Sequence, residues 1–243
     1  MQKNFLLNGV LAGCLTVSAG LVVAESPVAK TGQAPHQAST VKQREAADEL
    51  TRILRGIRTL KASFQQSTLD AGGRRIQESS GEMVLKRPNM FRWLVEDPFP
   101  QEVLSDGQQV SYYDKDMEQV TLQDLDISSS ATPALLLSGD TAEVLKNFSV
   151  ALAKGKSSDF FTLQPKSDDS PFQELQLTFA EGRLTTMLLL DSLGSRTSIR
   201  FTEVVNNIPV KDKTFELYVP PGIDVIDQRT TALKKSDKQS GKK

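Results

Sequence analysis

The feature that most constrains the fold is a long succession of short segments in which apolar and polar residues alternate. A period of two is typical of half-buried strands. The turn signals between segments, such as Asp106-Gly107, are too short for the crossover helices that parallel strands need, so neighbouring strands should run antiparallel. The first predicted strand alternates from Leu60 to Phe64. Later strands are predicted at residues 77–86, 90–96, 101–105, 109–113, 118–123, 149–153, 159–164, 172–180, 183–190, 196–205 and 214–219.

Three stretches instead have the period or the end signals of a helix. From Val41 to about Arg58, apolar residues recur at steps of three and four. Start and stop signals predict a short helix over residues 132–139, and a second one is expected from about Asp140 through Phe148. Helices that occur only before and between runs of strands exclude an alternating βα fold. The sequence therefore predicts an α+β protein with a strongly curved antiparallel sheet and helices on its concave side.

Both ends of the chain are expected to lie outside the folded domain, which is predicted to span residues 41–227. Lys3 and an apolar run to Ala24 are typical of a signal peptide, residues 1–24, with cleavage after Ala24. Residues 25–40 have the composition of a disordered linker, and residues 228–243 that of a basic, disordered tail.

A rival interpretation of the N-terminal segment concerns Cys14. Residues 11–14 have the form of a lipobox, in which Cys14 would be lipidated and would tether the protein to a membrane. The segment from Leu15 to Ala24 stays apolar, however, where a tether would be polar. We therefore favour simple cleavage and a periplasmic protein.

The residue inventory excludes most catalytic and metal sites. Cys14 is the only cysteine and His36 the only histidine, and both lie outside the predicted folded domain. There is no nucleophile elbow, phosphate-binding loop or zinc-binding motif. Paired carboxylates such as Asp168 and Asp169 lie in turn-like stretches, where solvation is expected. We expect no catalysis, no cofactor and no metal site, and a hydrolase that works through Asp or Ser residues is the alternative from another class.

One block combines an apolar strand pattern with a permanent charge. Met83 and Leu85 alternate on one predicted strand and Phe91 and Trp93 on the next, with Arg87 between them. An arginine at such a strand end can simply reach solvent. Alternatively, its five fixed donors can bond helix-end carbonyls across a cavity mouth and hold a lid shut. This arrangement suits a binding cavity better than a catalytic site.

From about residue 49 to residue 227, the chain resembles the LolA family of periplasmic outer-membrane lipoprotein carriers. The blocks that carry the resemblance are residues 81–93, 104–107, 113–121, 132–137, 161–165, 187–194 and 215–225. The residue pattern predicts about eleven strands with helices on the concave side of their sheet, and the resemblance implies that these form an incomplete antiparallel β-barrel capped by a helical lid. It also implies a monomeric carrier of lipoprotein acyl chains, which passes from an ATP-driven releasing complex of the inner membrane to an outer-membrane receptor and binds no nucleic acid. A membrane-anchored receptor of the same fold and a carrier of another lipid are the alternatives.

The resemblance also suggests site residues. Arg87 aligns with the family's lid-latching arginine. The candidate lining of the acyl-chain cavity consists of Leu54, Met83, Leu85, Phe91, Trp93, Leu135, Leu136, Phe148, Leu188 and Leu190. A lid that fills the empty cavity with its own leucines would lower the net affinity for cargo by the cost of opening, so that a tightly held chain can be released.

Overall fold

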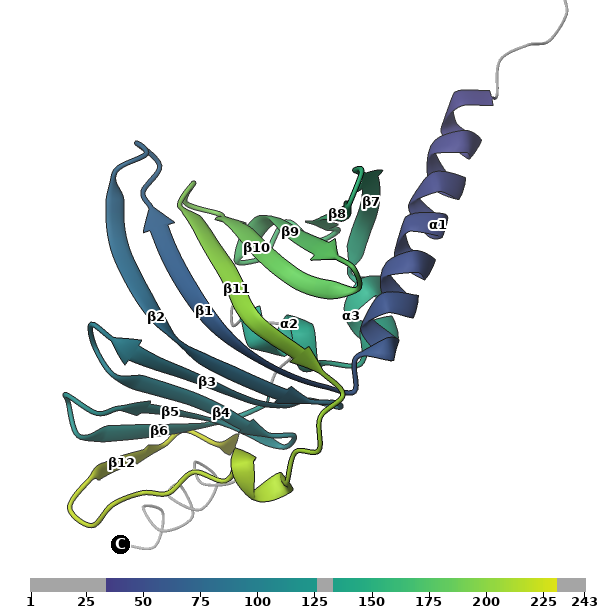
Figure 1. Ribbon diagram of the computed structural model, residues 1–243. Coiled ribbons are helices and arrows are strands. Elements are labelled where there is room, and N and C mark those ends of the chain that lie inside the picture. The colour runs from purple at the N-terminus through teal and green to yellow at the C-terminus, as the bar shows by residue number, and fades with distance from the viewer. Residues whose placement is uncertain (1–33, 126–132, 231–243) are drawn as a thin grey trace, which may run out of the picture. The chain divides into compact units, whose positions relative to one another are not determined.

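The computed structural model describes residues 34–125 and 133–230 (Figure 1). The helices are α1 (Ala34–Gly56), α2 (Pro133–Ser138), α3 (Thr141–Lys146) and the 3-10 helix η1 (Asp212–Phe215). The strands before α2 are β1 (Thr59–Leu69), β2 (Arg75–Lys86), β3 (Met90–Asp97), β4 (Gln101–Asp106), β5 (Gln109–Asp114) and β6 (Gln119–Asp124). Those after α3 are β7 (Phe148–Lys154), β8 (Ser158–Pro165), β9 (Phe172–Ala180), β10 (Arg183–Asp191), β11 (Arg196–Asn206) and β12 (Asp224–Asp227).

Within these described residues, all twelve strands belong to one open, curved sheet. Their order is β12-β6-β5-β4-β3-β2-β1-β11-β10-β9-β8-β7. The two halves of the chain meet where β1 pairs antiparallel with β11. The pairs are antiparallel throughout, except for the parallel pair of β12 with β6. In Figure 1, α2 and α3 lie inside the curve of the sheet, and α1 runs past one end of the sheet. The predicted α+β class and the open, antiparallel-dominated barrel are confirmed.

The last predicted strand is wrong. Residues 214–219 form the end of η1 and an extended segment without pairing, and the final strand is β12, which begins at Asp224. The chain leaves β11 in the middle of the sheet and must reach the free edge of β6, so this segment is a crossing connection rather than a neighbour of β11. Only Phe215 is buried within it, at 1% exposure.

The helices lie close to their predicted places but differ at their ends. The helix expected from Val41 to Arg58 begins at Ala34, within the predicted linker, and ends at Gly56. Gly56 disfavours further helix, and the chain enters β1 at Thr59. The helix expected to reach Phe148 ends at Lys146, because Phe148 already belongs to β7.

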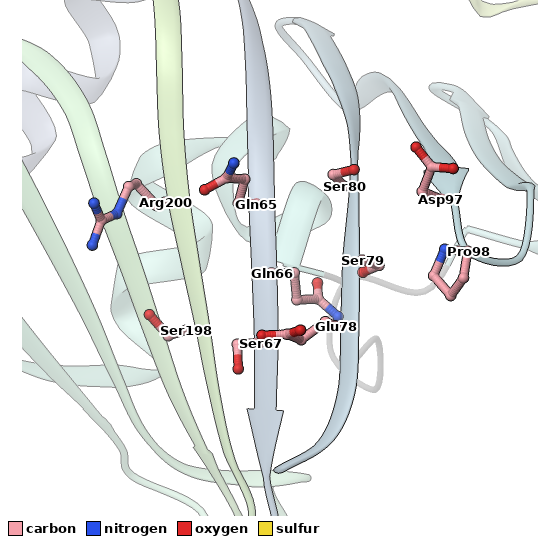
Figure 2. Close-up of a pocket in the computed structure, with 10 residues that line it drawn as sticks. All are labelled: Gln65, Gln66, Ser67, Glu78, Ser79, Ser80, Asp97, Pro98, Ser198 and Arg200. Atoms are coloured by element: carbon pink, nitrogen blue, oxygen red, sulfur yellow. The ribbon is translucent and has the colours of Figure 1, made fainter.

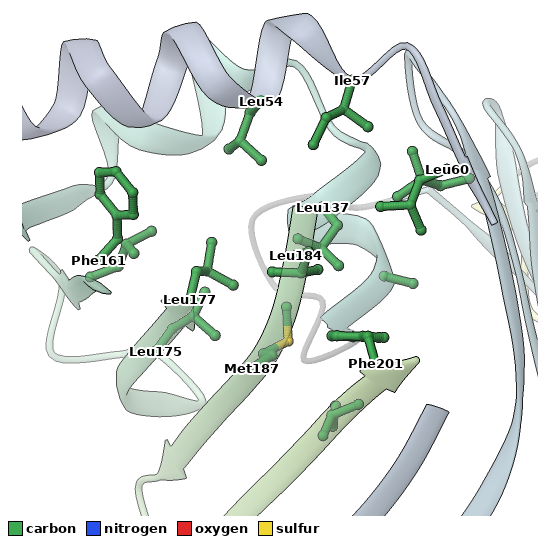
Figure 3. Packing of buried hydrophobic residues seen from close by; sticks show 14 of the residues in the cluster. Leu54, Ile57, Leu60, Leu137, Phe161, Leu175, Leu177, Leu184, Met187 and Phe201 are labelled. Atoms are coloured by element: carbon green, nitrogen blue, oxygen red, sulfur yellow. The ribbon is translucent and has the colours of Figure 1, made fainter. Parts of the chain in front are cut away.

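Most buried apolar residues form a single cluster on one face of the sheet and beneath the helices (Figure 3). Strand residues enter it alternately, as Leu60, Ala62 and Phe64 do on β1. From α1 it receives Leu50 and Leu54, at the spacing of one helical face. Each large side chain buried in this way stabilises the fold by about 1.5–3 kcal/mol. The helices are therefore held on the sheet by apolar contact.

Outside this cluster, Phe215 anchors the connection to β12 by packing η1 against β3 and β4. Phe215→Ala is expected to lower the free energy of unfolding by about 3–5 kcal/mol, because the neighbours can only partly fill the space left behind. Tyr218→Ala, three residues on and 76% exposed, should change it by about 0.5 kcal/mol or less. Chemical denaturation of both variants tests this, and equal small effects would contradict it.

Candidate functional site

Arg87 joins the C-terminal ends of two helices. It follows β2 directly, and its Nε donates to the carbonyl of Ile57 at 3.0 Å, just past the end of α1. Its Nη1 donates to the carbonyl of Gly139, just past α2. The last carbonyls of a helix have no partner within the helix and carry the negative end of its dipole, which favours a cation there. One side chain thus holds the C-terminal ends of α1 and α2 at the same corner of the sheet.

Backbone bonds reinforce this corner. The N–H of Arg87 donates to the carbonyl of Arg58 at 2.9 Å, and the N–H of Asn89 donates to the carbonyl of Ser138 at 2.8 Å. The loop between β2 and β3 therefore contacts both helix ends by backbone as well as by side chain.

Burial of the Arg87 guanidinium costs free energy, and its hydrogen bonds contribute free energy. Burial lowers the pKa of Arg87 to about 10, and the negative charge of Asp140 opposes that shift. At neutral pH the group stays protonated, so the free energy of removing its charge from water offsets part of what its hydrogen bonds contribute. The contact is specific in geometry and modest in net free energy, which is a favourable combination for a reversible closure.

Asn207 fixes the hinge between α1 and β1. Its side-chain nitrogen donates to the carbonyl of Gly56 at 2.9 Å, and its side-chain oxygen accepts from the N–H of Arg58 at 2.8 Å. Its own N–H donates to the carbonyl of Thr59 at 2.7 Å. The residue has a φ of 60°, a left-handed conformation that asparagine tolerates better than most residues. With Arg87, it accounts for most of the polar backbone groups at the hinge.

Asn207→Gly should loosen the hinge and keep the backbone conformation. The change removes two hydrogen bonds of about 1 kcal/mol each, so the amide of Arg58 should exchange with solvent about 30-fold faster. Hydrogen exchange followed by NMR measures this directly. Asn206→Ala removes only a 3.3 Å contact to the Gly182 carbonyl and should leave that amide unchanged. Equal exchange in the two variants would contradict the hinge assignment.

Six of the residues proposed from the sequence as cavity lining are buried together in the main cluster. They are Leu54, Met83, Leu85, Phe91, Trp93 and Phe148. The ring of Trp93 stacks on Phe64, with centroids 4.1 Å apart, and meets Phe201 edge to face. The side chains of Leu135 and Leu136 lie outside the described residues, although their backbone belongs to α2.

Two proposed lining residues, Leu188 and Leu190, require correction. Met187 pairs with Leu177 and Ile199 and is fully buried in the cluster. Leu188, the next residue, must point to the other face of the sheet, where it is 38% exposed. Leu190 shares that face. The run from Met187 to Leu190 is apolar on both faces, so alternation could not tell which residues point inward.

Other residues of the cluster were not proposed as lining. Phe64, Leu137, Met187 and Phe201 are all buried in it. For Phe64 and Phe201, alternation with polar neighbours was an available signal. Asn207 lies in a connection with no periodicity, so no local signal could assign it to the hinge.

A pocket of about 870 Å³ lies across β1, β2 and β11 and includes the end of β3 (Figure 2). Its lining is Gln65, Gln66, Ser67, Glu78, Ser79, Ser80, Asp97, Pro98, Ser198 and Arg200. Such a polar lining suits water and polar groups and does not suit an acyl chain. In the part of the chain that the structure describes, no three His, Cys, Asp or Glu residues are grouped to hold a metal ion.

Among residues 34–125 and 133–230, no helix combines the length and the apolar character needed to cross a membrane. α1 spans 23 residues, but its outer face is charged, as shown by the ion pair of Arg52 with Glu49. Its buried apolar residues, among them Leu50 and Leu54, lie on the face that meets the sheet. The helix is therefore built to cover an apolar surface.

Comparison with known proteins identifies a matching family. The family model of the outer membrane lipoprotein carrier protein LolA matches residues 55–218. An outer-membrane lipoprotein carrier protein of Pseudomonas paraeruginosa is 43% identical over 183 residues, which are 75% of this chain and 88% of the relative. One of Pseudomonas syringae pv. syringae is 43% identical over 179 residues, covering 74% and 86%.

Solved structures are more distant. A LolA superfamily protein from Nitrosomonas europaea has a TM-score of 0.44 at 13% identity, covering 71% of this chain and 98% of its own. An uncharacterized conserved protein from Thermus thermophilus has a TM-score of 0.49 at 12% identity, covering 76% and 99%.

Proposed function

Since the chain belongs to the LolA family of outer-membrane lipoprotein carrier proteins, we propose that it binds the acyl chains of lipoproteins on its concave apolar face and carries them across the periplasm. The main support for the proposal is that Arg87 donates hydrogen bonds to the C-terminal ends of α1 and α2, over a cluster of buried apolar side chains. We call α1 and α2 the lid. It is the element that would move aside for cargo.

The energetics explain why a carrier needs a lid. Each buried methylene contributes about 0.8 kcal/mol, so one long acyl chain could contribute on the order of 10 kcal/mol. A rigid, open cavity would release such a chain very slowly. Closure of the lid on its own apolar residues, among them Leu54 and Leu137, competes with the cargo and lowers its net affinity. Arg87 sets part of the strength of that competition.

The partners follow from the same proposal. Cargo would come from an ATP-driven releasing complex of the inner membrane and pass to a lipoprotein receptor of the outer membrane. The protein would act by binding alone, with no covalent step. Arg87 would latch the lid in the empty state and would yield when acyl chains enter.

Mass spectrometry of the protein isolated natively from periplasm tests this function. The expected result is a mature chain that begins near Glu25 and co-purifies with a triacylated lipoprotein. A diacylglyceryl group on Cys14 would support the membrane-anchored receptor instead. A free lipid as the sole bound molecule would contradict the lipoprotein assignment.

A further inference from the structure

β10 and β11 separate before either strand ends. Their pairing runs from Leu190 opposite Arg196 to Thr186 opposite Arg200, and no β10–β11 pair follows within the described residues. Beyond that point β10 still pairs with β9, and β11 still pairs with β1. The two strands therefore diverge while each stays attached to its other neighbour.

Two irregularities at the same level account for the separation. The register of β10 against β9 shifts between Leu184 and Thr186, and the register of β11 against β1 shifts opposite Lys61 and Ser63. Within the second irregularity, Glu203 has a φ of 53°. Bulges bend a strand and increase its twist, so bulges on both strands turn them apart.

Between the diverging strands lies an open pocket of about 420 Å³, which we call the β10–β11 wedge. It is lined by Arg183, Leu184, Thr185, Phe201, Thr202, Glu203, Val204 and Val205. Leu184 and Phe201 are 1% and 4% exposed and also belong to the main cluster, as Figure 3 shows, whereas Val205 is 49% exposed. The lining of the wedge thus includes both residues of the concave apolar cluster and residues exposed at the surface of the sheet.

We propose that the β10–β11 wedge is a second binding site for cargo, which takes one acyl chain of the lipoprotein. The inference rests on the proposed function, since the cargo is the source of the chain. Leu184 and Phe201 belong both to its lining and to the apolar cluster beneath the lid, so a chain held in the wedge would extend the apolar surface that the proposed function assigns to cargo.

The rest of the lining suits the same ligand. Arg183 and Glu203 are exposed, and each is held by a polar neighbour, Glu181 and Ser63 respectively. The rim is therefore polar and the floor apolar, which matches an acyl chain whose ester or amide end stays near water. Strand edges without a β10–β11 partner offer backbone groups to that polar end.

Photocrosslinking tests the wedge directly. Benzoylphenylalanine replaces Val205 in the wedge, Tyr112 on the concave side, or Leu188 on the outer face of β10, and each protein is loaded with a lipoprotein that carries deuterated acyl chains. If the wedge binds an acyl chain, a labelled acyl adduct should form at Val205 and at Tyr112, and none should form at Leu188. An adduct at Tyr112 without one at Val205 would overturn the wedge and leave the proposed function standing. Absence of label at all three positions would overturn both, and equal labelling at Leu188 and Val205 would show nonspecific surface contact and overturn the wedge.

Binding measurements give a second test that does not depend on the photoreaction. Val205→Trp fills the wedge from an exposed position and should weaken binding of the triacylated lipoprotein about tenfold, the loss expected when about two methylenes are displaced. Leu188→Trp places the same bulk on the outer face and should leave affinity unchanged. Circular dichroism of both variants checks folding. Equal affinities for Val205→Trp and the unmodified protein would overturn the wedge.

Discussion

Arg87→Leu is expected to trap the cargo. The change leaves the carbonyls of Ile57 and Gly139 without their donor whenever the lid closes, and each buried, unsatisfied acceptor costs about 1–3 kcal/mol. A loss of about 3 kcal/mol from the closed, empty state lowers its population relative to the open state about 100-fold. Since the closed state competes with cargo, net affinity should rise and transfer to an acceptor should slow by up to that factor.

The comparison needs two matched variants. Arg87→Lys retains the charge but offers a compact ammonium in place of a planar fork, so it should satisfy the two carbonyls incompletely and transfer at an intermediate rate. Arg74→Leu removes an exposed arginine that pairs with Asp70 in the turn between β1 and β2, and it should transfer normally. The measurement is the rate at which labelled lipoprotein passes to receptor-bearing vesicles. Normal transfer by Arg87→Leu would refute its role as a latch.

Met187→Ala is expected to destabilise the protein far more than Leu188→Ala. Met187 is fully buried within the apolar cluster, and truncation of a buried methionine costs about 2–5 kcal/mol because a cavity remains. Leu188 is 38% exposed on the opposite face, and its truncation should cost about 1 kcal/mol or less. Because the two residues are adjacent on the same strand, the comparison shows which face of β10 is buried.

Urea denaturation of the two variants measures the difference in unfolding free energy. Equal losses would mean that both faces of β10 are covered. A larger loss for Leu188→Ala would place Leu188 inside and would reverse the assignment of the concave face.

The parts of the fold that were predictable are those with local signals. Alternation located the strands from β1 to β11. For Arg87, the residues alone left two interpretations open, solvent exposure and bonds to helix ends, and only the family resemblance favoured the second. The alternation of a strand depends on residues within a few positions of one another, whereas the bonds of Arg87 to Ile57 and Gly139 span 30 and 52 residues. The role of Arg87 as a latch was an expectation from family resemblance, and it stays a prediction.

What could not be predicted depends on contacts between distant segments. β12 pairs in parallel with β6, about a hundred residues earlier, and nothing in Asp224 to Asp227 indicates that partner. The hinge bonds of Asn207 to Arg58 and Gly56 span 149 and 151 residues. On β10, the sequence prediction placed Leu188 and Leu190 on the inward face, whereas Met187 points inward. Because side chains alternate between the two faces of a strand, an error of one residue exchanges the inward and outward residues.

We propose that the protein takes lipoproteins out of one membrane and delivers them to another. The most direct test incubates the purified protein with inner-membrane vesicles that contain the ATP-driven releasing complex and a radiolabelled lipoprotein, and then adds outer membranes. We expect the label to appear in the aqueous phase as a one-to-one complex with the protein and then to move to the outer membranes. Label that stays in the inner-membrane vesicles, or that leaves them equally well without the protein, would contradict it.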